Sequence, residues 1–388
     1  MRRYVPLRIG RLWIQVGMIE EFLINSKREA SFLTQGLKFE SISEFDLFSF
    51  EVLSKYIHGK ERVEDIVSSK SFAFEVMFIK WANGTVFIDF MDFFFANLRV
   101  ALEHHEEEVL KLYIDCDLGI HEALVSYQDT AAMSSTATNV DNKRTKVKAG
   151  FNSLGDMIES SLYPQLKLIY GVLTLSKSSS LYGKNTNLSN GKMVTELIES
   201  SEVVSSVLSS LLLDVSLNQW RNISNHASYR YTKSSDSISC EYGSNNSHSI
   251  SFKYDEFGKL LKSVDCIQIL LKSCVELSSF DLCVKKHTNN NDDRYELTKE
   301  SVMSQIGNIL AILDYDILSV DKVLNHWKIN ITDVNSLGVS AFRELGRELI
   351  PYFLCMYKLY GVFVELEVFD NKGRTFQKLS LGNIGSMS

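Results

Sequence analysis

The chain has 388 residues, of which 45% are hydrophobic, 23% are charged and only three are proline, and its formal net charge is −7. At about 100–200 residues per domain, this length predicts two or three domains with ample apolar core, and the scarcity of proline favours long helices over linkers and disordered tails. The negative charge excludes a protein whose whole surface binds nucleic acid, although it leaves room for a local basic patch.

The sequence predicts neither a membrane span nor a secretory leader. The longest uncharged run, Ser301 to Leu313, has 13 residues, which is too short to cross a bilayer. Arg8 and Arg11 interrupt the segment where a signal peptide needs an apolar core. The six cysteines include no Cys-x-x-Cys pair and are interpreted as reduced core thiols. We therefore expect a cytoplasmic protein without membrane contact, bound metal or cofactor.

Residues 1–140 are expected to form an N-terminal α+β domain of no recognised family. Helix-like apolar spacing occurs at residues 17–33, 44–57, 99–113 and 119–133. Residues 71–95 are rich in β-branched and aromatic residues around the dipeptide Asn83-Gly84, which suits a type I′ turn. This segment predicts a β-hairpin whose second strand grades into helix.

A polar seam at residues 130–148 separates this domain from a helical region at residues 145–285. The seam ends in a basic run formed by Lys143, Arg144, Lys146 and Lys148. Helices are expected at residues 149–177, 191–213, 214–226 (with Asp214 as N-cap) and 256–282, and a hairpin of strands at residues 238–242 and 250–254. Pro164 should kink the first helix, because it removes the hydrogen bond to the carbonyl of Ser160.

A second polar seam at residues 287–294 precedes a C-terminal α+β region at residues 294–388. Its pattern predicts helices at residues 298–314 and 338–357, followed by a hairpin with strands at residues 362–368 and 374–381. The whole chain is thus expected to have a mainly α (α+β) fold, with a helical core between two α+β regions.

The residues that could carry chemistry surround Trp220. Arg221 and His226 are separated by four residues, and Asn222 follows the arginine directly. Histidine titrates near neutral pH and can act as general acid or base, whereas arginine stays charged and offers a planar fork to phosphate oxygens. Asn222 lies one helical turn before His226, so it can orient the imidazole or contact phosphate. Arg221 and His226 lie about 140° apart around an ideal helix, so one such pair converges poorly by itself.

These residues resemble the signature of the HEPN superfamily (higher eukaryote and prokaryote nucleotide-binding proteins): an arginine, a polar residue directly after it, and a histidine, with four to six residues between the arginine and the histidine. The predicted order of helices, with the motif at the end of the third, is similar to the four-helix HEPN core with a small β-hairpin insertion. This likeness covers residues 145–285, about a third of the chain.

The resemblance implies a metal-independent endoribonuclease that cleaves RNA through attack of the 2′-hydroxyl, so that DNA should resist cleavage. It also implies a homodimer whose two motifs, Arg221, Asn222 and His226, line a shared cleft. Glu159 on the first helix, or failing it Asp156, is the expected supporting residue. Many such proteins belong to bacterial toxin–antitoxin and antiphage systems, so the outer domains are expected to sense a trigger or an inhibitor protein.

Other interpretations stay open. Arg99, five residues before His104, repeats the spacing, but it lies in an amphipathic helix and is followed by Val100. A metal site at His104, His105, Glu106 and Glu108 is less consistent with the sequence than a solvated acidic face, because no second ligand cluster completes it. The basic run at residues 143–148 either contacts RNA or is a solvated linker. Some HEPN domains are non-catalytic, so the alternative function is a nucleotide-binding or scaffold protein.

Overall fold

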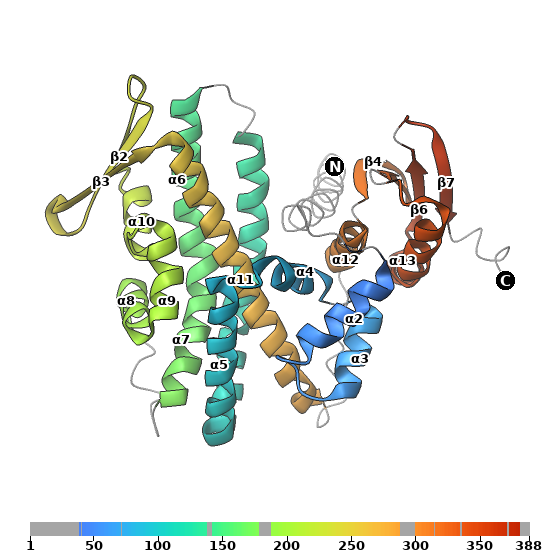
Figure 1. Cartoon of the computed structure of the whole chain (residues 1–388), viewed down its shortest axis with the longest axis horizontal. Coiled ribbons are helices and arrows are strands. Elements are labelled where there is room, and N and C mark those ends of the chain that lie inside the picture. The colour runs from blue at the N-terminus through green and yellow to red at the C-terminus, as the bar shows by residue number, and fades with distance from the viewer. Residues whose placement is uncertain are drawn as a thin grey trace, which may run out of the picture. The chain divides into compact units, whose positions relative to one another are not determined.

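The computed structural model of the chain describes residues 39, 41–70, 72–137, 142–177, 188–287, 299–313, 315–333, 336–370 and 372–380. These residues form a mainly helical fold with two small sheets, which confirms the expected α (α+β) class (Figure 1). None of the described helices has the length and apolarity needed to cross a membrane. The helix expected at residues 17–33 and the seam at residues 288–294 lie outside the described residues.

The chain divides into two compact units, one of residues 82–289 and one that joins residues 1–81 to residues 290–388. This division differs from the boundary expected near residue 140. The physical reason is the helical segment α5 (Val86–Ala137), which is kinked at His105 and packs against the helices that follow it, so that its residues belong to the same hydrophobic core as theirs. The small polar residues from Thr130 onward continue this helix, because alanine and methionine favour helix and serine does not prevent it.

The unit of residues 82–289 is a helical bundle that carries one small sheet. Its helices after α5 are α6 (Lys143–Asp156), α7 (Tyr163–Lys177), α8 (Asn190–Ser200), α9 (Glu202–Leu208), α10 (Leu217–Asn225) and α11 (Tyr254–His287). Helix α5 packs most extensively on α7, and α11 contacts both (Figure 1). Val109, Ile169 and Leu270, one from each of these helices, are fully buried. Because such side chains leave water completely, they supply most of the stability of the bundle.

Two of the predicted elements differ from the structure. Residues 71–95 form helix α4 (Ala73–Ala82) and the start of α5 instead of a hairpin, with Gly84 in the turn at φ 74°. A continuous apolar run fits a buried helix as well as a buried strand, and here both helices bury aromatic side chains on several sides. The helix expected at residues 191–213 is broken at Ser201, whose extended backbone (φ −164°) caps α9.

The first helix of the predicted core is continuous from Lys143 to Lys177, with a π-helical segment, η1 (Met157–Leu162), in its middle. The segment lies where the sequence predicts a kink. Pro164, two residues after its end, has no N–H to donate, and the backbone N–H of Tyr163 reaches back to the carbonyl of Ile158, five residues earlier. The wider turn rotates the side chains of η1 relative to those of α6 and α7.

A three-stranded antiparallel sheet is formed by the part of the chain that follows α10 and precedes α11. Its strands are β1 (Tyr229–Thr232), β2 (Ser237–Tyr242) and β3 (His248–Lys253), in that order (Figure 1). The sequence predicts β2 and β3 but not β1, which is only four residues long. Phe151 of α6 stacks on Tyr229, with ring centroids 3.9 Å apart, and on Phe257 of α11 at 4.6 Å. This stack fixes the sheet to the helical bundle.

The other unit contains α2 (Ile42–Leu53), α3 (Lys60–Ser69), α4, α12 (Lys299–Ile312) and α13 (Gly338–Tyr360) with a four-stranded sheet. The strands β4 (Asp316–Val323), β5 (His326–Thr332), β6 (Phe363–Phe369) and β7 (Thr375–Ser380) lie side by side in chain order. The hairpin of β6 and β7 confirms the C-terminal prediction, whereas β4 and β5 were not predicted. Strand β6 runs parallel to β5, since α13 connects them and covers the apolar face of the sheet.

The opposite face of this sheet carries a charged cluster centred on Glu367. Its side chain is only 5% exposed and forms ion pairs with Lys328 and Lys378, the latter at 3.0 Å between Nζ and Oε1. Thr375 Oγ1 donates to the same Oε1 at 2.9 Å. These contacts, led by the hydrogen bond from Lys328, lower the pKa of Glu367 to about 2. The ionised carboxylate therefore holds β5, β6 and β7 together.

We expect Glu367→Gln to lower the free energy of unfolding by about 3 kcal/mol at pH 7, because a broken buried ion pair leaves two lysines unbalanced. The pKa of Glu367 is lower in the folded chain than its ordinary value of 4.5. Its contribution is therefore complete above pH 4.5 and disappears as the pH falls toward about 2. Chemical denaturation of both proteins from pH 7 to 3 measures this difference. Glu365→Gln, two residues earlier on the same face, is the matched control, and parallel pH curves for wild type and Glu367→Gln would contradict the assignment.

Candidate functional site

Helix α10 presents the predicted motif because its other side is anchored in the core. Leu217, Trp220 and Ile223 are buried at the spacing of one helix face, and Trp220 Nε1 donates to the carbonyl of Leu212 at 2.9 Å. The N-cap is Ser216 and not the expected Asp214, which lies before the helix in a left-handed conformation (φ 57°). The opposite side of α10 therefore carries the polar residues Arg221, Asn222 and Asn225.

Arg221 is held in a bidentate ion pair by Glu159 from the π-helical segment η1. Its Nη2 lies 2.7 Å from Glu159 Oε1 and its Nε lies 3.1 Å from Oε2. Asn225 Nδ2 donates to the same Oε2 at 2.8 Å. Two parallel hydrogen bonds of this kind fix the plane of the guanidinium as well as its position. The structure thus brings together two of the predicted residues, Arg221 and Glu159, which are 62 positions apart in the sequence.

The close approach of α10 to η1 depends on Gly155, near the end of α6. A Cβ atom at this position would lie 2.8 Å from Asn225 Oδ1 and 3.0 Å from Ser224 Cβ, closer than carbon atoms normally pack. Only glycine leaves space for both side chains. Gly155 therefore sets the distance at which Asn225 reaches Glu159.

The electrostatics of the cluster favour the charged forms of both partners. Hydrogen bonds from Arg221 and then from Asn225 lower the pKa of Glu159, and the hydrogen bond with Glu159 raises the pKa of Arg221. Their side chains are 31% (Arg221) and 46% (Glu159) exposed, so water screens the pair and its net contribution to stability is modest. Tyr163 lies near the pair, and its burial raises its pKa to about 12. The cluster is therefore a fixed, ionised arrangement at neutral pH.

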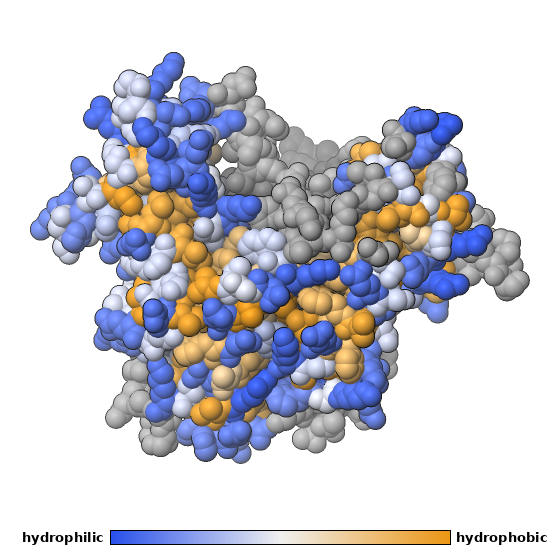
Figure 2. Space-filling view, viewed as in Figure 1, coloured by the Kyte–Doolittle hydropathy of each residue, from blue (hydrophilic) through white to orange (hydrophobic). Residues whose placement is uncertain are grey.

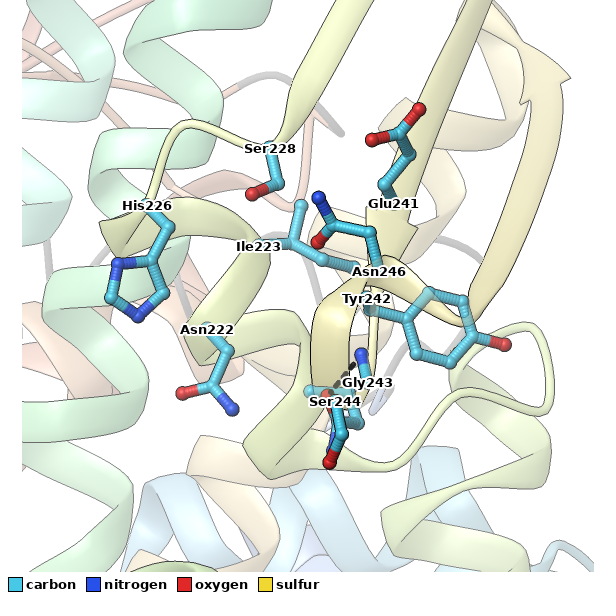
Figure 3. A pocket seen from close by; sticks show the side chains of 10 residues that line it. Asn222, Ile223, His226, Ser228, Glu241, Tyr242, Gly243, Ser244 and Asn246 are labelled. Carbon is cyan, nitrogen blue, oxygen red and sulfur yellow. Dashed lines mark hydrogen bonds between the residues drawn. The ribbon is translucent and has the colours of Figure 1, made fainter.

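His226 caps the C-terminus of α10 and is exposed. Its backbone N–H donates to the backbone carbonyl of Asn222 at 3.0 Å. The chain then leaves the helix through Ala227, which has a left-handed conformation (φ 50°). The imidazole lines an open pocket of about 280 Å³ together with Asn222, Ser228 and the turn between β2 and β3. Figure 3 shows the side chains of Asn222 and His226 on the same side of this pocket.

Asn222 links the two parts of the motif. Its Oδ1 lies 3.4 Å from Arg221 Nη1, and its side chain lines the pocket of His226. Arg221 donates to Glu159 of η1. His226, in contrast, lies beside Asn222 in the lining of the pocket (Figure 3). The two chemical groups therefore occupy neighbouring positions on different sides of one helix end, as their spacing of five residues requires.

The other carboxylate considered from the sequence lies elsewhere. Asp156 is the last residue of α6 and is exposed, one turn before Glu159. Glu159 forms the contacts with Arg221. The carboxylate of the site therefore comes from the π-helical segment and not from the regular helix before it.

The basic run begins helix α6 and is not a linker. Lys143 is paired with Asp236 at 2.7 Å, which also accepts from Tyr231, and its Nζ lies 4.6 Å from the centre of the Tyr254 ring. Arg144 and Lys148 are exposed one turn apart, and Lys146 is half-buried. Hydrophilic side chains cover this end of α6 and the neighbouring sheet (Figure 2). Cations at a helix N-terminus oppose the helix dipole, so Arg144 and Lys148 do not serve to stabilise α6.

No group of three or more metal-ligating side chains gathers in the described part of the chain. His104 and His105 lie where α5 leaves helical geometry, with φ −143° and ψ 42° at His105, and their rings are 6.4 Å apart. The neighbouring Glu106 is exposed, in agreement with a solvated acidic face. The chemistry available at α10 is thus that of an arginine, a histidine, amides and a carboxylate.

Sequence reasoning missed Asn225 and the turn between β2 and β3. Asn225 follows Arg221 by four residues, a spacing that places both on one helix face and could have indicated a common partner. The turn residues come from a strand pair that folds back on α10, and no local pattern predicts that contact. No known protein family, curated protein or solved structure matches this chain. Its function is therefore argued from the chemistry of these residues.

Proposed function

We propose that the chain is a metal-independent endoribonuclease of HEPN type that acts in the cytoplasm as a growth-arrest or antiphage effector. The observation that carries this proposal is the position of Asn222, which contacts Arg221 and lines the pocket of His226. A fixed cation, a solvent-accessible imidazole and a bridging amide on one helix end are the groups that RNA cleavage without a metal needs.

In the proposed reaction, His226 removes the proton of a ribose 2′-hydroxyl, and the 2′-oxygen then attacks the neighbouring phosphorus. The bond from phosphorus to the 5′-oxygen breaks, which leaves a 2′,3′-cyclic phosphate and a 5′-hydroxyl. The 5′-oxygen takes up a proton from water, and His226 releases to solvent the proton that it removed. DNA lacks the attacking group and is not cleaved.

Arg221 stabilises the extra negative charge that develops on the phosphate. A guanidinium carries five N–H donors. Glu159 accepts one hydrogen bond from the N–H of Nε and one from an N–H of Nη2. One N–H of Nη1 faces Asn222 Oδ1, so the second N–H of Nη1 and the second N–H of Nη2 remain for phosphate oxygens. Glu159 and Asn225 then act as positioning residues, since they fix the guanidinium before the substrate arrives and so reduce the reorganisation needed in the transition state.

A homodimer follows from the different directions of Arg221 and His226 on α10. Two copies related by a twofold axis can bring Arg221 of one subunit next to His226 of the other in one shared cleft. Arg144 and Lys148 are the candidates for contacting the RNA backbone, because Lys143 is engaged by Asp236. The remaining residues of the chain would respond to a trigger or an inhibitor protein.

The test is incubation of the purified protein with a structured RNA in EDTA, beside the DNA of the same sequence. We expect cleavage of the RNA alone, with 2′,3′-cyclic phosphate ends detected by mass spectrometry, because the reaction needs a 2′-hydroxyl and no metal. Since a trigger can be required in vitro, growth of cells that express the protein is measured in parallel. Cleavage that needs a divalent metal, or cleavage of DNA at a similar rate, would contradict this mechanism.

The alternative is a non-catalytic nucleotide-binding or scaffold protein that uses the helical unit to dimerise. The observation that favours it is the ion pair itself, since Arg221 already has a partner in Glu159. Neither RNA cleavage in vitro nor toxicity in cells, for a protein that still dimerises, would support this alternative.

A further inference from the structure

The pocket beside His226 has two walls of different origin. One wall is the exposed side of α10, with Asn222 and His226, and the other is the tight turn between β2 and β3, with Ser244 and Asn246. Ser228 lies between them, where the chain passes from α10 to β1 (Figure 3). The sheet thus serves to bring a turn against the end of the proposed catalytic helix.

This turn has a defined backbone conformation. Asn245 and Asn246 are both left-handed, each with φ 56°, and Gly243 has φ 82°. A Cβ atom at Gly243 would lie 2.8 Å from His248 Cδ2, so only glycine fits. The N–H of Gly243 donates to Gln219 Oε1 at 3.3 Å, which ties the turn to α10. Hairpin turns commonly require positive φ, and asparagine and glycine adopt it most readily.

The chemistry of the pocket is neutral and polar on the side of His226. Its side chains there are the amides of Asn222 and Asn246 and the hydroxyls of Ser228 and Ser244, and no lysine or arginine of the described chain lines it. The one carboxylate, Glu241, extends away from His226 in Figure 3, whereas the amide of Asn246 is directed toward Ser228. A phosphate needs cationic or N–H-rich surroundings, so this pocket does not suit one.

A ligand for this pocket must be small, uncharged and able to donate and accept hydrogen bonds side by side. The volume of about 280 Å³ lies near the lower limit of small-molecule sites, which begin at about 300 Å³. A single nucleobase meets these conditions, because its edge presents neighbouring donors and acceptors that carboxamides match.

We propose that this pocket binds the base of the nucleotide whose 2′-hydroxyl His226 activates, and that Asn246 reads the edge of that base. The assignment rests on the proposed ribonuclease function and adds a source of sequence preference to it. Asn246 contacts the base and not the reacting atoms. Its replacement should change which RNA is cut more than how fast the best RNA reacts at saturation.

The experiment compares wild type with Asn246→Ala and with Ser251→Ala, an exposed serine on β3 outside the pocket, as the matched control. Calorimetry measures binding of the 3′-monophosphates of adenosine, cytidine, guanosine and uridine. Cleavage of four short RNAs that differ only in the base before one scissile bond is measured in EDTA. We expect wild type and Ser251→Ala to prefer one base by at least about fivefold, and Asn246→Ala to lose most of this preference, as the loss of one hydrogen bond predicts.

The two measurements separate the inference from the function on which it rests. Binding with a base preference that Asn246→Ala removes, without any cleavage of RNA, would support the pocket and count against the ribonuclease. Cleavage without base preference, or a preference that Asn246→Ala leaves unchanged, would overturn the pocket while the ribonuclease stands. Failure of wild type to bind any of the four nucleotides would also overturn it.

Discussion

Replacement of His226 by alanine is expected to lower the rate of RNA cleavage by about a hundredfold to ten-thousandfold, the usual contribution of a general acid or base. The fold should not change, because the imidazole is exposed at the end of α10 and the helix is anchored through Trp220 and Ile223 on its other side. Single-turnover cleavage of a short RNA in EDTA measures the loss, and thermal unfolding checks that the protein is intact.

The matched control for this variant is His326→Ala, which removes another exposed histidine, in the other unit, with a long contact of 3.9 Å to Glu365. We expect its cleavage rate to equal that of wild type. A His226→Ala protein that cleaves RNA at the wild-type rate would show that the imidazole has no part in the reaction. A loss of rate together with a lower midpoint of unfolding would instead assign His226 a structural role.

The helices of the proposed core could be predicted because their apolar spacing is regular and their caps are local. The helix expected at residues 149–177 is found as α6, η1 and α7, and Pro164 marks the irregular turn within it. The same reasoning failed at residues 71–95. A segment that is apolar on every side carries no period, so its β-branched and aromatic composition favoured strands where tertiary packing imposes helices.

The sequence indicates some residues of the candidate site but not their geometry. The spacing of Arg221, Asn222 and His226 follows from the sequence, whereas the expectation of Glu159 or Asp156 on the first helix of the core follows from the resemblance to HEPN proteins. The choice of Glu159 over Asp156 depends on the π-helical segment, which rotates Glu159 toward Arg221. The pocket depends on a sheet that folds back on α10, a long-range contact that no local pattern contains.

Arg221 provides the second large expected effect. Arg221→Ala should lower the cleavage rate by about a hundredfold to a thousandfold, as the removal of one donor to a developing oxyanion does elsewhere. Arg221→Lys should not restore it, because an ammonium cannot keep the bidentate contact with Glu159 and present further donors to phosphate. Cleavage kinetics of the three proteins in EDTA measure both effects. A lysine variant with wild-type activity would show that charge alone is sufficient.

The direction of the two side chains makes a sharper test of the shared cleft. If each reaction centre combines Arg221 of one subunit with His226 of the other, then Arg221→Ala and His226→Ala proteins, each inactive, should regain activity when they are mixed and allowed to exchange subunits. In a mixed dimer one centre has lost both residues and the other has kept both. Since half of the dimers in a random mixture are of this kind, activity should return to about a quarter of the wild-type level.

The same mixture gives the opposite result for a centre built within one subunit. Each centre then lacks one of its two residues whichever chains associate, so the mixture should stay as inactive as its components. A mixture of Arg221→Ala with Glu159→Gln is the matched control for this complementation. Both residues lie on the same subunit's half of the cleft and contact each other directly. In the shared arrangement a mixed dimer therefore keeps an altered residue in each centre, and we expect less recovery than for the first pair.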